Sequence, residues 1–165
     1  MISERSEEKQ MYIEEMGMVL EGFGMTRIAG RVLSALLVAE PPEQTAEQLA
    51  ATLQASRGAI SGGTTTLETL ALIERRRRPG DRKDDFRNKP NAWFEATKKQ
   101  AAMITHLRGL AEKGLAVMES GDADATQGLR DMRDMLRFYE RELPELLKRW
   151  EAKVEAESVA QEETV

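Results

Sequence analysis

The stretch TAEQLAATLQASRGAISGGTTTLETLALIERRRRPGDRKDDFRN, residues 45–88, decides the fold of this 165-residue chain. Thr45, followed three residues later by Gln48, forms a capping box, which marks the start of a short helix. After a tight turn, Ser56 caps a second helix over about 57–70. Two short helices joined by such a turn predict a helix-turn-helix.

The second helix of this pair has two different sides. Its predicted buried side recurs at steps of three and four residues and comprises Ile60, Gly63, Thr64, Leu67 and Leu70. The opposite side is small and polar and comprises Gly58, Ser61, Gly62, Thr65 and Thr69, with Arg57 in the first turn. Such a helix is suited to pack on a core with one face and to meet a polar partner with the other.

A hairpin follows the helix-turn-helix. Residues 72–78 are expected to form a strand, residues 79–81 a turn, and residues 85–89 a returning strand. A hairpin in this position is the wing of a winged-helix domain. The predicted fold is therefore mainly α with a small β-hairpin wing.

Four longer amphipathic helices flank this stretch, over about 4–22, 25–39, 92–119 and 123–158. Pro144 lies within the last, where a kink or two abutting helices are expected. The apolar stripes of the terminal helices exceed what a domain of this size covers alone, which favours a homodimer. We expect an N-terminal dimerisation helix (1–24), a winged helix-turn-helix domain (25–91) and a C-terminal helical dimerisation region (92–165).

Charge is distributed unevenly along the chain. The net charge is −5, yet residues 75–89 contain eight basic and three acidic side chains. Both ends of the sequence are acidic. Because a protein's field is local and is screened beyond roughly 8–10 Å, a chain that is acidic overall still binds phosphate where its cations gather.

The composition excludes several functions. Cysteine is absent and His106 is the only histidine, so neither thiol chemistry nor a multi-histidine metal site is available. His106 is expected to be structural rather than a ligand or a pH switch. No nucleophile–base pair or phosphate-binding glycine loop is evident, so we expect no enzyme, cofactor or metal. Without a signal peptide or a long apolar run, we expect a cytoplasmic protein that does not enter membranes.

The sequence resembles the MarR superfamily of bacterial regulators, and its GbsR-like branch in particular. The resemblance covers about residues 25–95 and rests on an ordered set of motifs, namely Gly30–Arg31–Val32–Leu33, Gln54–Ala55–Ser56–Arg57–Gly58, Leu72–Ile73–Glu74–Arg75 and Gly80–Asp81–Arg82. It implies a homodimer on double-stranded DNA, with recognition helices in successive major grooves and wings at the flanking minor grooves. It also implies control by a small-molecule effector, since many members respond to such ligands, choline among them in the named branch. We therefore expect a repressor that binds a roughly palindromic operator.

The expected DNA contacts begin at Ser56, Arg57 and Gly58, where a helix N-terminus and a guanidinium suit a phosphate. Ser61, Thr65 and Thr69 are expected to meet phosphates or base edges. Gly62 either allows close approach to DNA or is simply tolerated in a buried helix. The family often has bulky or basic side chains where this sequence has Gly62–Gly63 and three threonines, which shifts the expected balance towards backbone contacts.

In the wing, Arg82 at the tip is the strongest candidate for the minor groove, followed by Lys83. The four arginines 75–78 alternate along a strand, so two of them, assigned as Arg76 and Arg78, are expected to face the duplex and two to face solvent or carboxylates. A solvated charge run is the alternative interpretation of these arginines.

Two further alternatives stay open at this point. Trp93 and Phe94, with Tyr12, Met16 or Tyr139, are candidates for an effector pocket or an aromatic cage, although packing is the more common role of such residues. The winged helix is also compatible with a protein-interaction module that binds no specific DNA. Salt-dependent binding of duplex DNA distinguishes the two functions.

Overall fold

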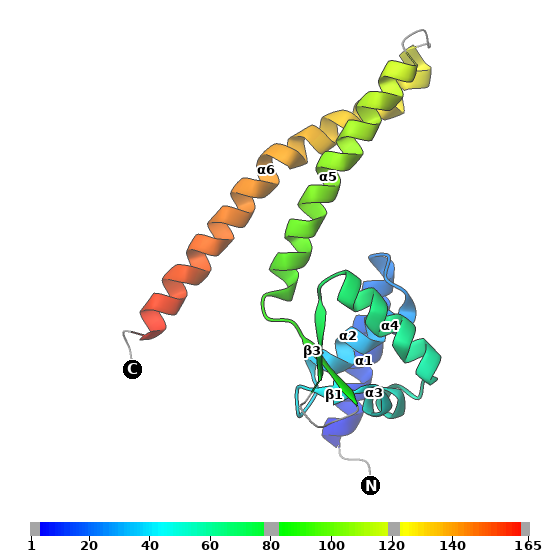
Figure 1. Cartoon of the computed structure of the whole chain (residues 1–165), viewed down its shortest axis with the longest axis vertical. Helices are drawn as coiled ribbons and strands as arrows, with labels where there is room; N and C mark the ends of the chain where they lie inside the picture. The colour runs from blue at the N-terminus through cyan, green and yellow to red at the C-terminus, as the bar shows by residue number, and fades with distance from the viewer. Residues whose placement is uncertain (1–3, 78–82, 119–122, 163–165) are drawn as a thin grey trace. The chain divides into compact units, whose positions relative to one another are not determined.

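The computed structural model describes residues 4–77, 83–118 and 123–162, and the chain divides into two compact units, Met1–Ala96 and Thr97–Val165 (Figure 1). The three-part division expected from the sequence, with boundaries after residues 24 and 91, stays a prediction.

The first unit contains four helices and three strands among its described residues: α1 (Glu4–Gly22), α2 (Arg27–Leu37), β1 (Gln44–Thr45), α3 (Ala46–Leu53), α4 (Arg57–Thr69), β2 (Ile73–Arg77) and β3 (Asp84–Asn88), followed by the start of α5 (Ala92–Val117). The expected bounds of α1 are confirmed, whereas α2 is shorter at both ends than the expected 25–39. It begins at Arg27 because the Thr26 side chain caps it by accepting a hydrogen bond from the Ala29 amide (3.3 Å).

The predicted capping box of α3 is confirmed. The Gln48 amide donates to the Thr45 hydroxyl (3.1 Å), and the Thr45 amide donates to the Gln48 side chain (2.7 Å). The helix ends at Gln54, which adopts a left-handed conformation (φ 49°). Ser56 then caps α4 by accepting from the Ala59 amide (3.2 Å). Local side-chain chemistry therefore sets the turn between the two helices.

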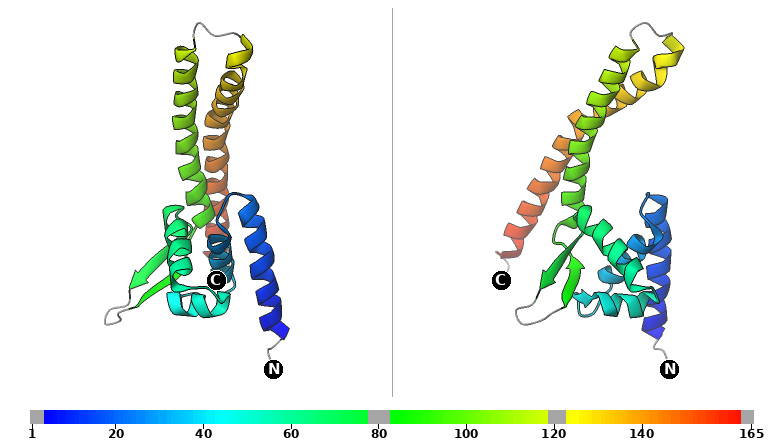
Figure 2. Two further views of the ribbon diagram at one scale, coloured as in Figure 1. Left: turned by 90° about the vertical axis from the view of Figure 1, so that its right-hand side faces the viewer. Right: turned by 45° about the vertical axis from the view of Figure 1, so that its right-hand side comes forward.

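The expected wing hairpin is confirmed, with one strand more than the sequence predicted. β2 and β3 pair antiparallel, with Arg75 opposite Phe86, and the two-residue strand β1 pairs with the other edge of β3. The order is therefore β1-β3-β2. Because β1 lies immediately before α3, this pairing fixes the wing to the start of the helix-turn-helix. Figure 2 shows β2 and β3 extending away from the helices of this unit.

The core of the first unit lies around α2. Ala29, Val32, Leu33 and Leu36 are almost completely buried there, and Leu49, Leu53, Ile60, Leu67 and Leu72 from the surrounding elements complete the cluster. Helix α1 lies side by side with α2 (Figure 2). They cross at Gly17 and Gly30, where a Cβ on Gly30 would lie only 3.0 Å from the Gly17 carbonyl oxygen. Glycine is required here by the close approach of the two backbones.

The buried face of α4 agrees with the prediction at four of five positions. Ile60, Gly63, Thr64 and Leu67 are buried, but Leu70 is 39% exposed. The expectation for Leu70 was wrong because the helix ends at Thr69. Leu70 is the C-cap, at the very end of the helix, where its side chain is only partly covered.

The second unit consists of α6 (Ala123–Glu162) and the remainder of α5. Helix α6 is continuous through Pro144, so the expected alternative of two abutting helices was wrong. The helices are antiparallel and separate towards the end of α6 (Figures 1 and 2). Arg108 pairs with Glu140 (2.6 Å) and Arg137 with Glu112 (2.9 Å) across them. Near their connection Leu129 packs against Gly114, whose added Cβ would lie 3.2 Å from it.

The apolar stripe predicted for residues 123–158 is divided between two surfaces. Leu129, Leu136, Leu143 and Leu147 are half-buried, whereas six large apolar side chains of α6 are 39–54% exposed: Met132, Met135, Phe138, Tyr139, Leu146 and Trp150. We call these six residues the α6 apolar face. His106 lies exposed on α5.

Neither a membrane-spanning helix nor a cluster of metal-ligating side chains is found in the described ranges. None of the helices there combines the length and the apolar character needed to cross a membrane. No three His, Cys, Asp or Glu side chains in those ranges are grouped as metal ligands would be.

Candidate nucleic-acid interface

The first turn of α4 is open to solvent. Ser56, Arg57 and Gly58 are all exposed, and the Arg57 side chain is 85% accessible. Amide groups at a helix start lack partners within the helix and carry partial positive charge, to which the Arg57 guanidinium adds a full one. This turn therefore has the chemistry of an anion site, and its predicted contact with DNA stays a prediction.

Beyond this turn, α4 keeps a small and polar outer face. Ser61, Gly62, Thr65 and Thr69 are exposed, as expected. The Thr69 hydroxyl donates to the Thr65 carbonyl oxygen (2.9 Å), and the Thr66 hydroxyl donates to that of Gly62 (3.0 Å). These hydrogen bonds hold both hydroxyls against the helix backbone. Few side chains therefore project from the outer face of α4, and another backbone can approach it closely.

The two adjacent glycines of α4 have different surroundings. A Cβ on Gly63 would lie 3.3 Å from a Val32 methyl and 3.4 Å from the Ile28 carbonyl oxygen, so the predicted packing role of Gly63 is confirmed. An added Cβ on Gly62 would meet no atom within 4 Å. Packing within the described part of the chain therefore gives no reason for glycine at 62, and its close approach to DNA stays a prediction.

The described wing arginines all bind carboxylates. Arg75 makes a bidentate pair with Glu68 of α4 (2.9 and 3.1 Å) and a further contact with Asp84 (3.3 Å), and the Glu68 hydrogen bond raises the pKa of Arg75. Its guanidinium also lies over the Phe86 ring, 5.3 Å from the centroid. Arg77 also pairs with Asp84 (3.2 Å). Arg75 and Arg77 therefore share one face of β2, which agrees with strand alternation.

Arg76 lies on the other face of β2. It pairs with Glu74 (3.1 Å) and approaches Glu43 at 3.9 Å, while Arg87 binds the same Glu74 at 2.6 Å. The Arg87 hydrogen bond lowers the pKa of Glu74, against the opposing effect of burial. The expected assignment of Arg76 to DNA stays a prediction. Arg78 and Arg82 lie outside the described residues.

Lys83 lies within reach of the helix-turn-helix. Its ammonium group is 2.9 Å from a carboxylate oxygen of Glu47, in the first turn of α3, and the other oxygen of Glu47 is 4.0 Å from Arg57. Glu47, Arg57, Ser61 and Lys83 all line an open cavity of about 330 Å³ between α3, α4 and the sheet. The structure thus brings predicted contacts from the helix and the wing together at one place.

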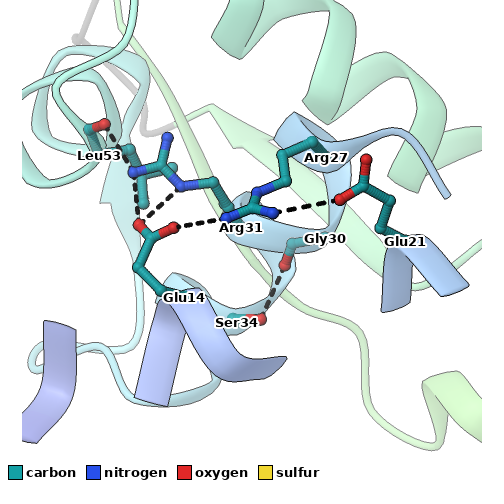
Figure 3. Close-up of polar contacts among 7 residues, drawn as sticks. All are labelled: Glu14, Glu21, Arg27, Gly30, Arg31, Ser34 and Leu53. Carbon is teal, nitrogen blue, oxygen red and sulfur yellow. Dashed lines mark hydrogen bonds and ion pairs between the residues drawn. The ribbon is translucent and has the colours of Figure 1, made fainter. Parts of the chain in front are cut away.

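A second polar network connects α1 to the turn of the helix-turn-helix (Figure 3). Arg31 of α2 binds Glu14 of α1 through Nε (2.8 Å) and Nη2 (2.6 Å), and Nη2 also donates to the Leu53 carbonyl oxygen (3.0 Å). Leu53 is the last residue of α3, three residues before the Ser56 cap. Arg27 binds Glu14 and Glu21 but has no such contact with α3. Arg31 therefore helps to position the turn that leads into α4.

Burial tends to raise the pKa of Glu14, but the opposing effects of Arg31 and Arg27 are larger in sum. Their hydrogen bonds and positive charges lower the pKa of this carboxyl below its ordinary value of 4.5. Glu14 is therefore ionised throughout the neutral range, and the link between α1 and α2 keeps its charge there.

The four residues expected to form an effector pocket have different environments. Tyr12 and Met16 are half-buried on α1 and pack against the core. At the start of α5, Trp93 is 55% exposed and Phe94 is half-buried. Neither the cavity beside Lys83 nor a smaller one of about 180 Å³ between α1, α2 and α3 is lined by any of these four. The effector pocket stays a prediction.

Sequence reasoning missed the residues that connect the site to its surroundings. Glu47 and Lys83 are 36 positions apart, Arg31 and Leu53 are 22 apart, and Arg31 and Glu14 are 17 apart. No helical or strand spacing relates positions so distant. The Gly30–Arg31–Val32–Leu33 motif includes Arg31 but indicates no partner for it.

Comparison with known proteins gives concordant results for the two parts of the chain. Residues 23–84 match the model of the MarR family, and residues 91–153 match that of MmpR5-like MarR family transcriptional regulators. The HTH-type transcriptional regulator MmpR5 of Mycobacterium tuberculosis is 36% identical over 139 residues, which cover 84% of each chain. A crystal structure of a transcriptional regulator with 34% identity covers 88% of this chain and 99% of its own, with a TM-score of 0.79.

Proposed function

Because the chain belongs to the MarR family of DNA-binding transcriptional regulators, we propose that it is a repressor that acts as a homodimer on a roughly palindromic operator. The observation that carries this proposal is the exposed first turn of α4 at Ser56, Arg57 and Gly58, beside a wing lysine that reaches the same cavity. Repression follows if the bound dimer covers promoter DNA. The GbsR-like branch stays a prediction.

In this proposal most of the binding free energy comes from phosphates. Arg57, Lys83 and the amides at the start of α4 hold the DNA backbone, and Arg76, Arg78 and Arg82 of the wing add to this term. Ser61, Thr65 and Thr69 meet base edges or phosphates, with Gly62 allowing close approach. Because the outer face of α4 has few long side chains, groove shape contributes much of the sequence preference.

The homodimer part of the proposal is supported by the α6 apolar face. Six large apolar side chains exposed on one helix are more than the surface of a monomer ordinarily presents, and a second copy of the chain covers them. A two-fold symmetric dimer also presents two copies of α4 to two half-sites, which explains a palindromic operator.

Control by a small ligand, in the cytoplasm where the chromosome lies, completes the proposal. In the proposed dimer, the two winged-helix domains can be held at a separation that fits the operator or at one that does not. A ligand that binds one of these two forms more tightly shifts the population of dimers towards that form. Tyr12, Met16, Trp93 and Phe94 are the proposed contacts. A screen for compounds that release the protein from its operator tests this part independently of DNA binding itself.

The experiment for the main proposal is fluorescence anisotropy with a labelled duplex from the region upstream of the gene and a scrambled duplex of the same composition. Measurements at two salt concentrations separate phosphate contacts from sequence preference. We expect tighter binding to the native duplex and a steep loss of affinity with salt. Absence of binding to either duplex at low salt would contradict the proposal and favour a protein-interaction module.

A further inference from the structure

Two of the proposed DNA contacts, from different elements, share one carboxylate. Lys83 of the wing lies 2.9 Å from one oxygen of Glu47, and Arg57 of the recognition helix lies 4.0 Å from the other. Glu47 belongs to the first turn of α3 and is itself about half exposed. It therefore connects the wing to the helix-turn-helix through its charge, on the side of the domain where DNA is proposed to bind.

The cavity beside Glu47 is suited to a phosphate group. It is open to solvent, has a volume of about 330 Å³, and is lined by residues of α3, α4 and the sheet, among them Arg75 paired with the second carboxylate, Asp84. Arg57, Ser61 and Lys83 supply donors to it. A carboxylate and a phosphate are alike in presenting anionic oxygens to such donors. In the DNA-free protein, Glu47 provides the anion.

We propose that Glu47 limits the affinity of this protein for DNA, because it holds Lys83 and Arg57 in the free state and a backbone phosphate must displace it. This inference rests on the proposed DNA-binding function. The cost applies to every duplex, since phosphates carry no sequence information. Glu47 therefore weakens binding to the operator and to unrelated DNA by the same factor, so it lowers the affinity for DNA without changing the ratio of the two affinities.

Two other roles for Glu47 make different predictions. An acidic residue in the first turn of a helix stabilises that helix through its dipole, and this role affects stability without strengthening DNA binding. A glutamate that accepts a hydrogen bond from a cytosine amino group would instead contribute to operator affinity, so that its loss would weaken binding to the operator alone.

The test compares two variants of the full chain with the same change of charge. Glu47→Gln removes the anion between Arg57 and Lys83. Glu40→Gln removes an anion that pairs with Arg5 and Lys9 of α1, away from the proposed contacts. Affinities for the upstream and the scrambled duplex are measured by anisotropy over a range of salt concentrations, and thermal unfolding of each variant is measured alongside.

We expect Glu47→Gln to bind both duplexes roughly three- to tenfold more tightly at low salt, with the advantage shrinking as salt screens the charges. Glu40→Gln should stay within about twofold of the wild type. Adding Lys83→Ala to Glu47→Gln should remove most of the gain, because the lysine released by the first change is then absent.

Three results would overturn the inference while leaving the proposed function intact: wild-type binding to the upstream duplex with no gain in Glu47→Gln, an equal gain in Glu40→Gln, or weaker operator binding by Glu47→Gln. If neither the wild type nor Glu47→Gln binds any duplex at low salt, the proposed function fails, and this inference fails with it.

Discussion

The two units of this chain bury their apolar side chains to very different extents. Among the described residues, every almost fully buried apolar side chain except Ala111 lies in the first unit. The second unit instead exposes the α6 apolar face, and between its helices it combines half-buried leucines with ion pairs such as Arg108–Glu140. The first unit encloses an apolar core of its own, whereas the second exposes an apolar surface, and we propose that a second copy of the chain covers it.

The largest effect is expected from charge on the α6 apolar face. Met135→Glu places a carboxylate within this face and should convert the proposed dimer to a monomer. Loss of two-site attachment should weaken operator binding by roughly a hundredfold or more. Sedimentation equilibrium measures the first effect and anisotropy the second.

The control for this variant is Arg130→Glu, an exposed position that helical spacing places on the polar side of α6. It should stay dimeric although it adds more negative charge. If the Met135→Glu protein remains dimeric and binds the operator normally, the α6 apolar face is not the dimer interface. The exposed apolar side chains of the second unit would then not be explained by a second copy of the chain.

The next largest effect is expected in the core of the first unit. Leu67 is fully buried and Leu70 is 39% exposed, although both follow the same helical spacing. Leu67→Ala should lower the free energy of unfolding by about 2–5 kcal/mol, because it leaves a cavity. Leu70→Ala should lower it by much less, because the Leu70 side chain is partly exposed already. Urea denaturation measures both. Equal costs would mean that α4 is not packed as described.

A smaller effect is expected where α1 meets the helix-turn-helix. Arg31→Met removes the donor to the Leu53 carbonyl oxygen and the half-buried partner of Glu14, and should cost about 1–3 kcal/mol of unfolding free energy. Arg27→Met removes only exposed ion pairs and should cost less than about 1 kcal/mol. Denaturant unfolding of both proteins decides whether the Leu53 contact matters, because without it the two costs would be similar.

The smallest effect is expected from acid. The pKa of Glu14 is lowered in the folded chain, so its contribution to stability is complete above the unfolded pKa and is lost as the pH falls through the folded one. Stability should therefore decline below about pH 4.5, and Glu14→Gln should reduce the part of this decline that Glu14 causes. Unfolding midpoints from pH 6 to about pH 3 provide the comparison. An identical pH profile in the variant would show that Glu14 does not contribute.

The parts of the fold that were predictable from sequence depend on neighbouring residues. Thr45 with Gln48 and Ser56 with Ala59 are local caps, and the buried face of α4 repeats at helical spacing up to Leu67. The spacing stopped being informative at Leu70, because the helix ends one residue earlier. The strand β1 was missed because two residues form a strand there only by pairing with β3.

The candidate site was less predictable because its electrostatics are set by residues that are distant in sequence. The sequence showed the density of wing arginines, but apart from Glu74 of β2 itself their partners come from other elements, namely α4 (Glu68), β3 (Asp84) and the segment before β1 (Glu43). The Glu47–Lys83 pair likewise requires the three-stranded sheet to place the wing beside α3. A count of charges along the chain contains none of this information.

The central claim, that the start of α4 contacts DNA, is tested most directly by the salt dependence of operator binding for Arg57→Ala. The control is Arg5→Ala, which removes another exposed arginine of the same unit. We predict that Arg57→Ala weakens binding and reduces the magnitude of the salt slope by about one, as loss of a phosphate contact requires, while Arg5→Ala changes neither. Unchanged affinity and slope in Arg57→Ala would contradict the account.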